Sequence, residues 1–141
     1  MAHHTKDKGD LGVLKAQADL FAQGFHVLLP LTEHAPFDLV AYKDGRFWRV
    51  QVKYRTPKPS GVMTIDFRSC WNDRHGTHMR PMNKQEVDLV CVYCPADDRC
   101  YYFNPRRFRN SVWLRLSPAR NGNRKNIHMA IDFRLVPTDD E

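Results

Sequence analysis

Segment 46–55 constrains the fold most, because its polar and apolar side chains alternate. Apolar or aromatic residues occupy the even positions from 48 to 54, and polar residues occupy the odd positions from 49 to 55. Successive side chains of a strand point to opposite faces, so this pattern predicts a strand with one buried and one polar face. The preceding Asp44-Gly45 is typical of a tight turn. We therefore predict a hairpin of residues 37–42 and 46–54.

The region before this hairpin predicts one helix and one strand. Leu11, Leu14, Ala18 and Phe21 recur at helical spacing, and Gly24 follows. This spacing places the four side chains on one face of a helix, and glycine commonly ends such a helix. We predict a helix over residues 7–23 and a short strand over 25–29.

The region after the hairpin continues the alternation of strands and loops. We expect strands over 62–68 and 112–116, a hairpin over 89–103, a short helix over 105–108, a long polar loop over 69–84 with a short helix near 83–86, and a basic loop over 120–126. The order predicts an α/β, more narrowly α+β, domain with a mixed sheet. We expect one domain over 1–141, with a core over about 6–104 and basic elements over 105–137.

The charge distribution favours a polyanionic partner. The chain of 141 residues has 22 Lys and Arg against 16 Asp and Glu, a net charge of +6. Residues 1–45 hold 4 basic and 6 acidic residues, so the excess lies in the rest of the chain. Nucleic acid is the commonest partner of such a surface. Apolar runs are far shorter than the ~20 residues of a membrane span, so we expect a cytoplasmic protein, associated with the nucleoid through DNA, and no membrane partner.

The predicted hairpin brings three polar groups together. Gln51 and Lys53 share the polar face of segment 46–55, and the turn can place Asp38 beside them. Mg²⁺ takes oxygen ligands, which the Asp38 carboxylate, the Gln51 amide and the Val52 backbone carbonyl can supply. A lysine beside the ion can orient or deprotonate water and stabilise charge on phosphorus. The grouping suits metal-assisted phosphodiester hydrolysis, although a solvated hairpin without function has the same residues.

Several motifs together resemble the PD-(D/E)XK nuclease superfamily, and within it the homing endonucleases associated with bacterial group I introns. They are Lys8-Gly9-Asp10-Leu11-Gly12 opening a helix, Glu33-His34-Ala35-Pro36-Phe37-Asp38-Leu39-Val40, and Arg49-Val50-Gln51-Val52-Lys53. The superfamily generally has an acid where this chain has Gln51, and the intron-associated branch is similar in having Gln. The resemblance implies a restriction-endonuclease-like core and a site-specific endonuclease for double-stranded DNA. It also implies Mg²⁺, with Mn²⁺ as a substitute, and a homodimer or homotetramer.

The resemblance leaves one catalytic position open. Many members carry a Glu in the first helix, and its place here falls near Val13, which cannot bind a metal. Asp10 lies one turn earlier and is a candidate substitute. Its alternative role is a favourable negative charge in the first helical turn.

Three basic clusters are candidates for DNA contacts, since arginine suits phosphate and guanine. They lie in segments 69–84, 106–109 and 120–125. The individual candidates are Arg55, Lys58, Arg68, Arg74, His75, Arg80 and Lys84.

Other functions stay open at this point. A Holliday-junction resolvase or a restriction-like nuclease would share the core, and a DNA-binding module without catalysis would account for Gln51 and Val13. A zinc-stabilised interaction domain would use Cys91, Cys94 and Cys100 with histidines 75 and 78. Cys91 and Cys94 are three residues apart on a predicted strand, which points them to opposite faces, so we expect free, structural thiols.

Overall fold

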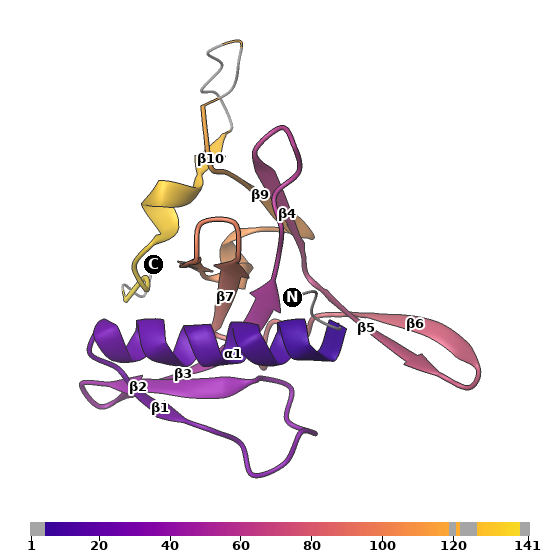
Figure 1. Ribbon diagram of the computed structural model, residues 1–141. Helices are drawn as coiled ribbons and strands as arrows, with labels where there is room; N and C mark the ends of the chain where they lie inside the picture. Colours follow the sequence, from indigo (N-terminus) through magenta and orange to yellow (C-terminus); the bar gives the residue numbers. More distant parts are fainter. Residues whose placement is uncertain (1–4, 119–120, 122–126, 139–141) are drawn as a thin grey trace.

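The computed structural model describes residues 5–118, 121 and 127–138. Its first element is the helix α1 (Thr5–Ala22), which lies along one face of a five-stranded sheet (Figure 1). The helix is followed by Gly24, whose positive φ of 93° suits glycine at a helix end. The predicted helix is confirmed, with a slightly earlier start.

The five-stranded sheet has the order β1-β2-β3-β7-β8. Its strands are β1 (His26–Leu28), β2 (Leu39–Lys43), β3 (Arg46–Tyr54), β7 (Leu89–Cys94) and β8 (Arg99–Phe103). Neighbouring strands are antiparallel except β3 and β7, which run parallel. A mixed sheet behind one N-terminal helix confirms the predicted α+β class.

The β2–β3 hairpin forms as the alternating pattern predicts. Asp44 and Gly45 both have positive φ, 53° and 79°, which is the geometry of a type I′ turn. The turn pairs Lys43 with Arg46, and the register continues to Leu39 opposite Val50. It therefore fixes which residues of β3 lie beside the start of β2.

Two hydrophobic cores lie on opposite faces of the sheet. The first, under α1, contains Trp48 and Val50 of β3 together with Leu20 of the helix. The second lies between β7–β8 and a small sheet of order β10-β9-β4, made of β10 (His128–Met129), β9 (Ser111–Arg115) and β4 (Val62–Asp66). Strand β7 is covered on both faces, so all six of its residues are buried.

The segment expected to be a long loop over 69–84 is instead a two-stranded ribbon, so that prediction was wrong. Strands β5 (Arg68–Asp73) and β6 (Gly76–Pro81) pair only with each other in the described sheets and project from the body (Figure 1). Arg68, which was predicted to end the strand over 62–68, instead begins the ribbon. Its residues are mostly exposed where described, so no buried apolar face marks it in the sequence.

The helix expected near 83–86 is also absent. Glu86 N–H donates to the Asn83 carbonyl at 3.0 Å, and Gln85 N–H donates to Asn83 Oδ1 at 3.0 Å, which makes a single turn. An asparagine side chain that bonds the backbone in this way favours a turn over a helix. Short 3₁₀ helices follow later, at η1 (Pro105–Arg107), as predicted, and at η2 (Ala130–Phe133), which was not predicted.

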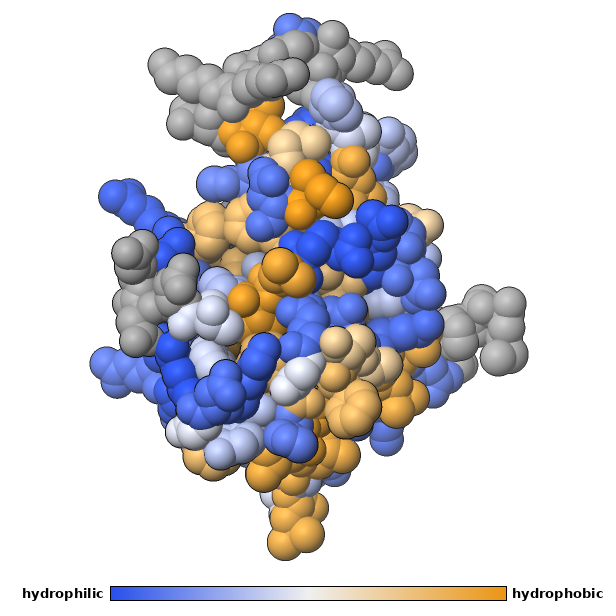
Figure 2. All heavy atoms as spheres, turned by 90° about the vertical axis from the view of Figure 1, so that its left-hand side faces the viewer, coloured by the Kyte–Doolittle hydropathy of each residue, from blue (hydrophilic) through white to orange (hydrophobic). Residues whose placement is uncertain are grey.

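The surface near the end of α1 and β1 is apolar (Figure 2). Leu14, Phe21, Leu28 and Leu29 are exposed there by 45% to 71% of their side-chain surface. No helix within the described ranges combines the length and the hydropathy that crossing a bilayer requires. The basic loop predicted over 120–126 lies outside the described residues except for Asn121.

Candidate active site

Backbone hydrogen bonds bring Asp38 to the polar face of β3. Asp38 N–H donates to the Val50 carbonyl at 2.9 Å, and Asp38 Oδ2 accepts from Val52 N–H at 2.7 Å. The side chain thus spans from the start of β2 to the strand that carries Gln51 and Lys53. The sequence predicted that Asp38 lies beside the polar face of β3, and the structure brings it there.

The Asp38 carboxylate is exposed to solvent on one side and surrounded by protein on the others. Desolvation by the surrounding protein raises its pKa, while the Val52 N–H and the positive charge of Lys53 act in the opposite direction. A carboxylate whose negative charge is not fully compensated attracts a cation. The site therefore favours a bound positive ion.

Lys53 is the single buried charged side chain of the described residues, at 8% exposure. Its Nζ donates to the Arg68 carbonyl at 3.3 Å, at the base of the ribbon. Burial, and then the charge of Arg55, lower the pKa of Lys53 from 10.5 to about 8, against the attraction of Asp38 and Asp66. An amine with a pKa near 8 can exchange a proton with water at physiological pH.

Gln51 shows that a divalent cation fits this site. Its Oε1 is buried and has no hydrogen-bond partner in the part of the chain that the structure describes. A buried acceptor without a partner costs about 1–3 kcal/mol, and a metal ion or its hydration water would remove that cost. One carboxylate with neutral oxygens and water is a set that Mg²⁺ or Mn²⁺ accepts. The Val52 carbonyl as a further ligand stays a prediction.

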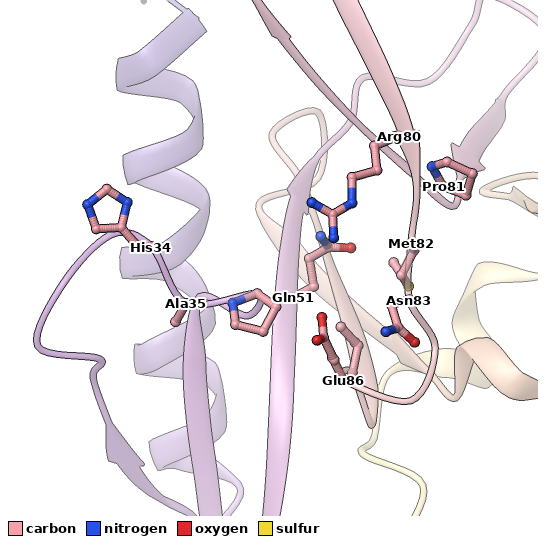
Figure 3. A pocket seen from close by; sticks show the side chains of 10 residues that line it. His34, Ala35, Gln51, Arg80, Pro81, Met82, Asn83 and Glu86 are labelled. Carbon is pink, nitrogen blue, oxygen red and sulfur yellow. The ribbon is translucent and has the colours of Figure 1, made fainter.

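A cavity of about 390 Å³ opens beside Gln51. Three segments form it: the loop before Asp38, strand β3, and the stretch from the end of β6 to the start of β7 (Figure 3). Its lining residues are His34, Ala35, Pro36, Gln51, Arg80, Pro81, Met82, Asn83, Glu86 and Val87. Arg80 reaches the cavity from β6 and Glu86 from the turn after it, so both charges face Gln51 (Figure 3).

Of the predicted DNA-binding residues, Arg80 lines this cavity and the others lie elsewhere on the described surface. Arg74 and His75 form the tip of the ribbon, where Asp73 Oδ1 accepts from His75 N–H at 2.7 Å. Arg68 begins the ribbon and lies 3.6 Å from Asp66. The roles of these residues stay predictions, as does that of Arg80.

The remaining basic candidates are engaged within the protein to different degrees. Lys84 Nζ donates to the Arg109 carbonyl at 2.6 Å and also to that of Phe108, so it ties the turn to the 3₁₀ region. Arg55 is half-buried and donates to the Tyr54 carbonyl at 2.8 Å, whereas Lys58 is exposed. Lys84 thus has a structural role that the sequence did not indicate.

The helical candidate Asp10 is not brought to this face of the sheet. It is exposed on α1, which packs on the face of β3 opposite to Gln51 and Lys53. A Cβ placed on Gly12 would lie 3.4 Å from Val52 Cγ1, which shows how closely the helix approaches that face. Val13 packs against the first core. The substitution of Asp10 for the missing acid stays a prediction.

Cys91, Cys94 and Cys100 are not grouped into a metal site with other described residues. Cys91 belongs to the first core and Cys94 to the second, so they point to opposite faces as predicted. Cys100 is also buried, and His78 Nε2 lies 3.0 Å from Asp73 on the ribbon. Within the described ranges, no three His, Cys, Asp or Glu residues are grouped to hold a metal. The zinc-stabilised domain therefore has no support.

The sequence did not indicate an ion pair that anchors the site. Arg49 Nε and Nη2 donate to the two oxygens of Asp88 at 2.8 and 3.0 Å, and Arg49 N–H donates to Oδ2 at 2.8 Å. Burial opposes charge on Asp88, but these bonds, with one from Arg106, lower its pKa to about 2. The pair holds the start of β7 against β3, and with it the turn that carries Glu86. The one sequence feature that could have pointed to this ion pair is the polar stretch directly before the fully apolar strand β7.

Comparisons with known proteins agree with this fold. The sequence matches the PD-(D/E)XK endonuclease family over residues 3–136. No protein with a curated description matches it. The structure is similar to the bacterial homing endonuclease I-Ssp6803I, with a TM-score of 0.73 and 24% identity over 94% of this chain and 89% of that one. A more distant likeness, with a TM-score of 0.47 and 13% identity over 77% and 84% of the two chains, is to Hjc, a Holliday junction resolvase from Archaeoglobus fulgidus. Because the family match spans nearly the whole sequence, the chain belongs to the PD-(D/E)XK endonuclease family.

Proposed function

We propose that this endonuclease hydrolyses phosphodiester bonds of double-stranded DNA at a specific site, in the manner of a homing enzyme, with Mg²⁺ or Mn²⁺ as cofactor. One observation carries the proposal: on one face of the β2–β3 hairpin lie the Asp38 carboxylate, the buried Lys53 and the Gln51 Oε1, which has no hydrogen-bond partner among the described residues. Enzymes of this family typically use divalent metals. Gln51 in the third position of the motif supports the intron-associated branch in particular.

Each of the three side chains has a distinct part in this proposal. Asp38 and Gln51 would hold the ion, with the Val52 carbonyl as a further ligand, and the ion would supply Lewis acidity. Lys53, with its pKa lowered to about 8 by burial, takes a proton from the attacking water or donates a hydrogen bond to the phosphate. The same burial aims its amine, since Nζ is held by the Arg68 carbonyl at 3.3 Å.

The β5–β6 ribbon is the surface that we expect to bind the duplex. The major groove of B-DNA admits a two-stranded β-ribbon. This ribbon projects from the body, carries Arg74 and His75 at its tip, and joins the active site through the bond between Lys53 and Arg68. DNA held by the ribbon would therefore lie beside the catalytic lysine.

Cutting both strands requires two active sites, and each chain supplies one set of Asp38, Gln51 and Lys53. We therefore propose that the active enzyme is a homodimer or homotetramer. The exposed apolar side chains on α1 and β1, Phe21 and Leu28 among them, form a surface that contact between copies would cover (Figure 2). Light scattering of the wild type and of Phe21→Glu tests this, and a monomeric wild type would contradict it.

A cleavage panel tests the proposed function. Linear duplex, four-way junction and single-stranded DNA are incubated with Mg²⁺ or Mn²⁺ and with wild type, Asp38→Ala or Lys53→Ala. We expect metal-dependent cuts in linear duplexes by the wild type alone. Exclusive cutting of four-way junctions would indicate a resolvase instead, and tight binding without cutting would indicate an inactive DNA-binding module. An open reading frame located inside an intron would further support the homing function.

A further inference from the structure

The active site has a single carboxylate close to Gln51 on the β2–β3 hairpin. Val13, the helix position at which the family resemblance implies an acid, is partly buried and packs against the first core. Asp10, the other candidate on the helix, is exposed on α1, which covers the opposite face of β3. The source of a second negative charge is therefore an open question for this chain.

Glu86 is an acidic residue that lines the cavity beside Gln51. It comes from the turn between β6 and β7, and Figure 3 shows its carboxylate pointing toward the Gln51 side chain, whose amide end points toward Arg80. Gln51 Oε1 has no hydrogen-bond partner within the described ranges, so Glu86 does not bond to it directly. A cavity of about 390 Å³ leaves room there for an ion with its water.

The protein holds Glu86 at this place from both sides. On one side, the turn is closed by the 3.0 Å bond from Glu86 N–H to the Asn83 carbonyl. On the other side, two residues along the chain, Asp88 is fixed to β3 by the three bonds from Arg49. The two anchors fix the backbone on either side of Glu86, whose side chain is half-buried.

The cavity also carries the positive charge that a substrate phosphate needs. Arg80 enters it from β6, and Figure 3 shows its guanidinium on the side of Gln51 opposite to Glu86. A carboxylate on one side and a guanidinium on the other are the charges that would face a hydrated cation and a phosphodiester, respectively.

We propose that Glu86 is the second acidic group of the active site, and that it holds the divalent ion of Asp38 and Gln51 through a water molecule of the ion's hydration shell. This inference rests on the proposed function of the site. It assigns to the turn after the ribbon a role that relatives give to the first helix. Groups that act on a metal through such an outer contact typically change its affinity about 10–100-fold.

Mn²⁺ binding to the free protein tests this without any DNA. The free Mn²⁺ signal in electron paramagnetic resonance is titrated with wild type, Glu86→Gln, Asp10→Asn and Asp38→Asn. Glu86→Gln keeps the size and polarity of the side chain, so circular dichroism and thermal unfolding should match the wild type. We expect about a tenfold or greater loss of Mn²⁺ affinity in Glu86→Gln and a larger loss in Asp38→Asn.

The control is Asp132→Asn, which removes one negative charge from the exposed helix η2 and should leave Mn²⁺ affinity unchanged. Wild-type affinity in Glu86→Gln, together with a loss in Asp10→Asn, would overturn the inference and assign the role to the helix. In that case the proposed function stands. If Asp38→Asn also binds Mn²⁺ as the wild type does, the metal site itself is misplaced and both proposals fall.

Discussion

The two faces of strand β3 differ in role: one packs in the hydrophobic core, and the other carries the polar groups of the proposed active site. Trp48, Val50 and Val52 pack toward α1 and the first core. Gln51 and Lys53 lie on the other face, where Gln51 Oε1 has no hydrogen-bond partner among the described residues and the Lys53 amine is buried. Burial stabilises the first face and costs stability on the second, because buried polar groups lose their hydration. Alternate residues of one strand can therefore serve stability on one face and catalysis on the other.

The largest effect we expect is on the chemical face. Lys53→Ala removes the amine beside the proposed metal, and general acid–base groups contribute about 10²–10⁴-fold to rate. We expect a loss of about 10³-fold in cleavage rate, measured in single turnover with saturating enzyme. The variant should stay folded, and a melting temperature well below that of the wild type would contradict the separation of the two faces.

A substitution on the structural face of β3 should have the opposite effect, a loss of stability with little loss of cleavage rate. Val50 is fully buried, at 0% exposure, so Val50→Ala leaves a cavity in the first core. We expect a loss of about 2–3 kcal/mol in the free energy of unfolding, measured by urea denaturation. Cleavage per folded molecule should stay near the wild-type rate at a temperature below the transition. A rate loss as large as that of Lys53→Ala would break the comparison.

The pH dependence of stability sharpens the comparison, because Lys53 is buried as a charge. Its pKa is lowered from 10.5 to about 8 by burial, so between these values the unfolded chain holds a proton that the folded chain has released. Stability from this group therefore rises with pH across that window, by at most about 1.4 kcal/mol per pH unit. We expect Lys53→Met to be more stable than wild type at pH 7, with an advantage that shrinks as the pH rises above 8. An advantage that grows instead would contradict the buried charge.

The smallest effect we expect is on the ribbon, which carries DNA contacts away from the chemistry. Arg74→Ala should weaken duplex binding modestly and reduce the slope of log affinity against log salt by about 1 if Arg74 contacts a phosphate. Fluorescence anisotropy at several salt concentrations measures both quantities. The matched control is Lys43→Gln at the opposite end of β2–β3, where Lys43 Nζ donates to the Gln23 carbonyl at 3.1 Å. An equal change of slope in the control would remove the ribbon from the proposed DNA surface.

The sequence predicted those parts of the fold in which local chemistry and burial agree. The period of two in β3 and the Asp44-Gly45 turn were sufficient to place Asp38 beside Gln51 and Lys53. The ribbon was missed because β6 has no buried face, and strand pairing there depends on the partner strand rather than on a hydrophobic pattern. Glu86 was missed as a cavity-lining residue for a related reason: its segment is held against β3 by the Arg49–Asp88 pair, which joins residues far apart in the sequence.

Metal-dependent cleavage of linear duplex DNA tests the central claim most directly, with Asp38→Ala and Lys53→Ala compared with Val50→Ala under conditions in which all are folded. We predict cuts that require Mg²⁺ or Mn²⁺ and disappear in Asp38→Ala and Lys53→Ala, while Val50→Ala cuts at nearly the wild-type rate. Cleavage by Asp38→Ala and Lys53→Ala at the wild-type rate would contradict the assignment of chemistry to this face of β3.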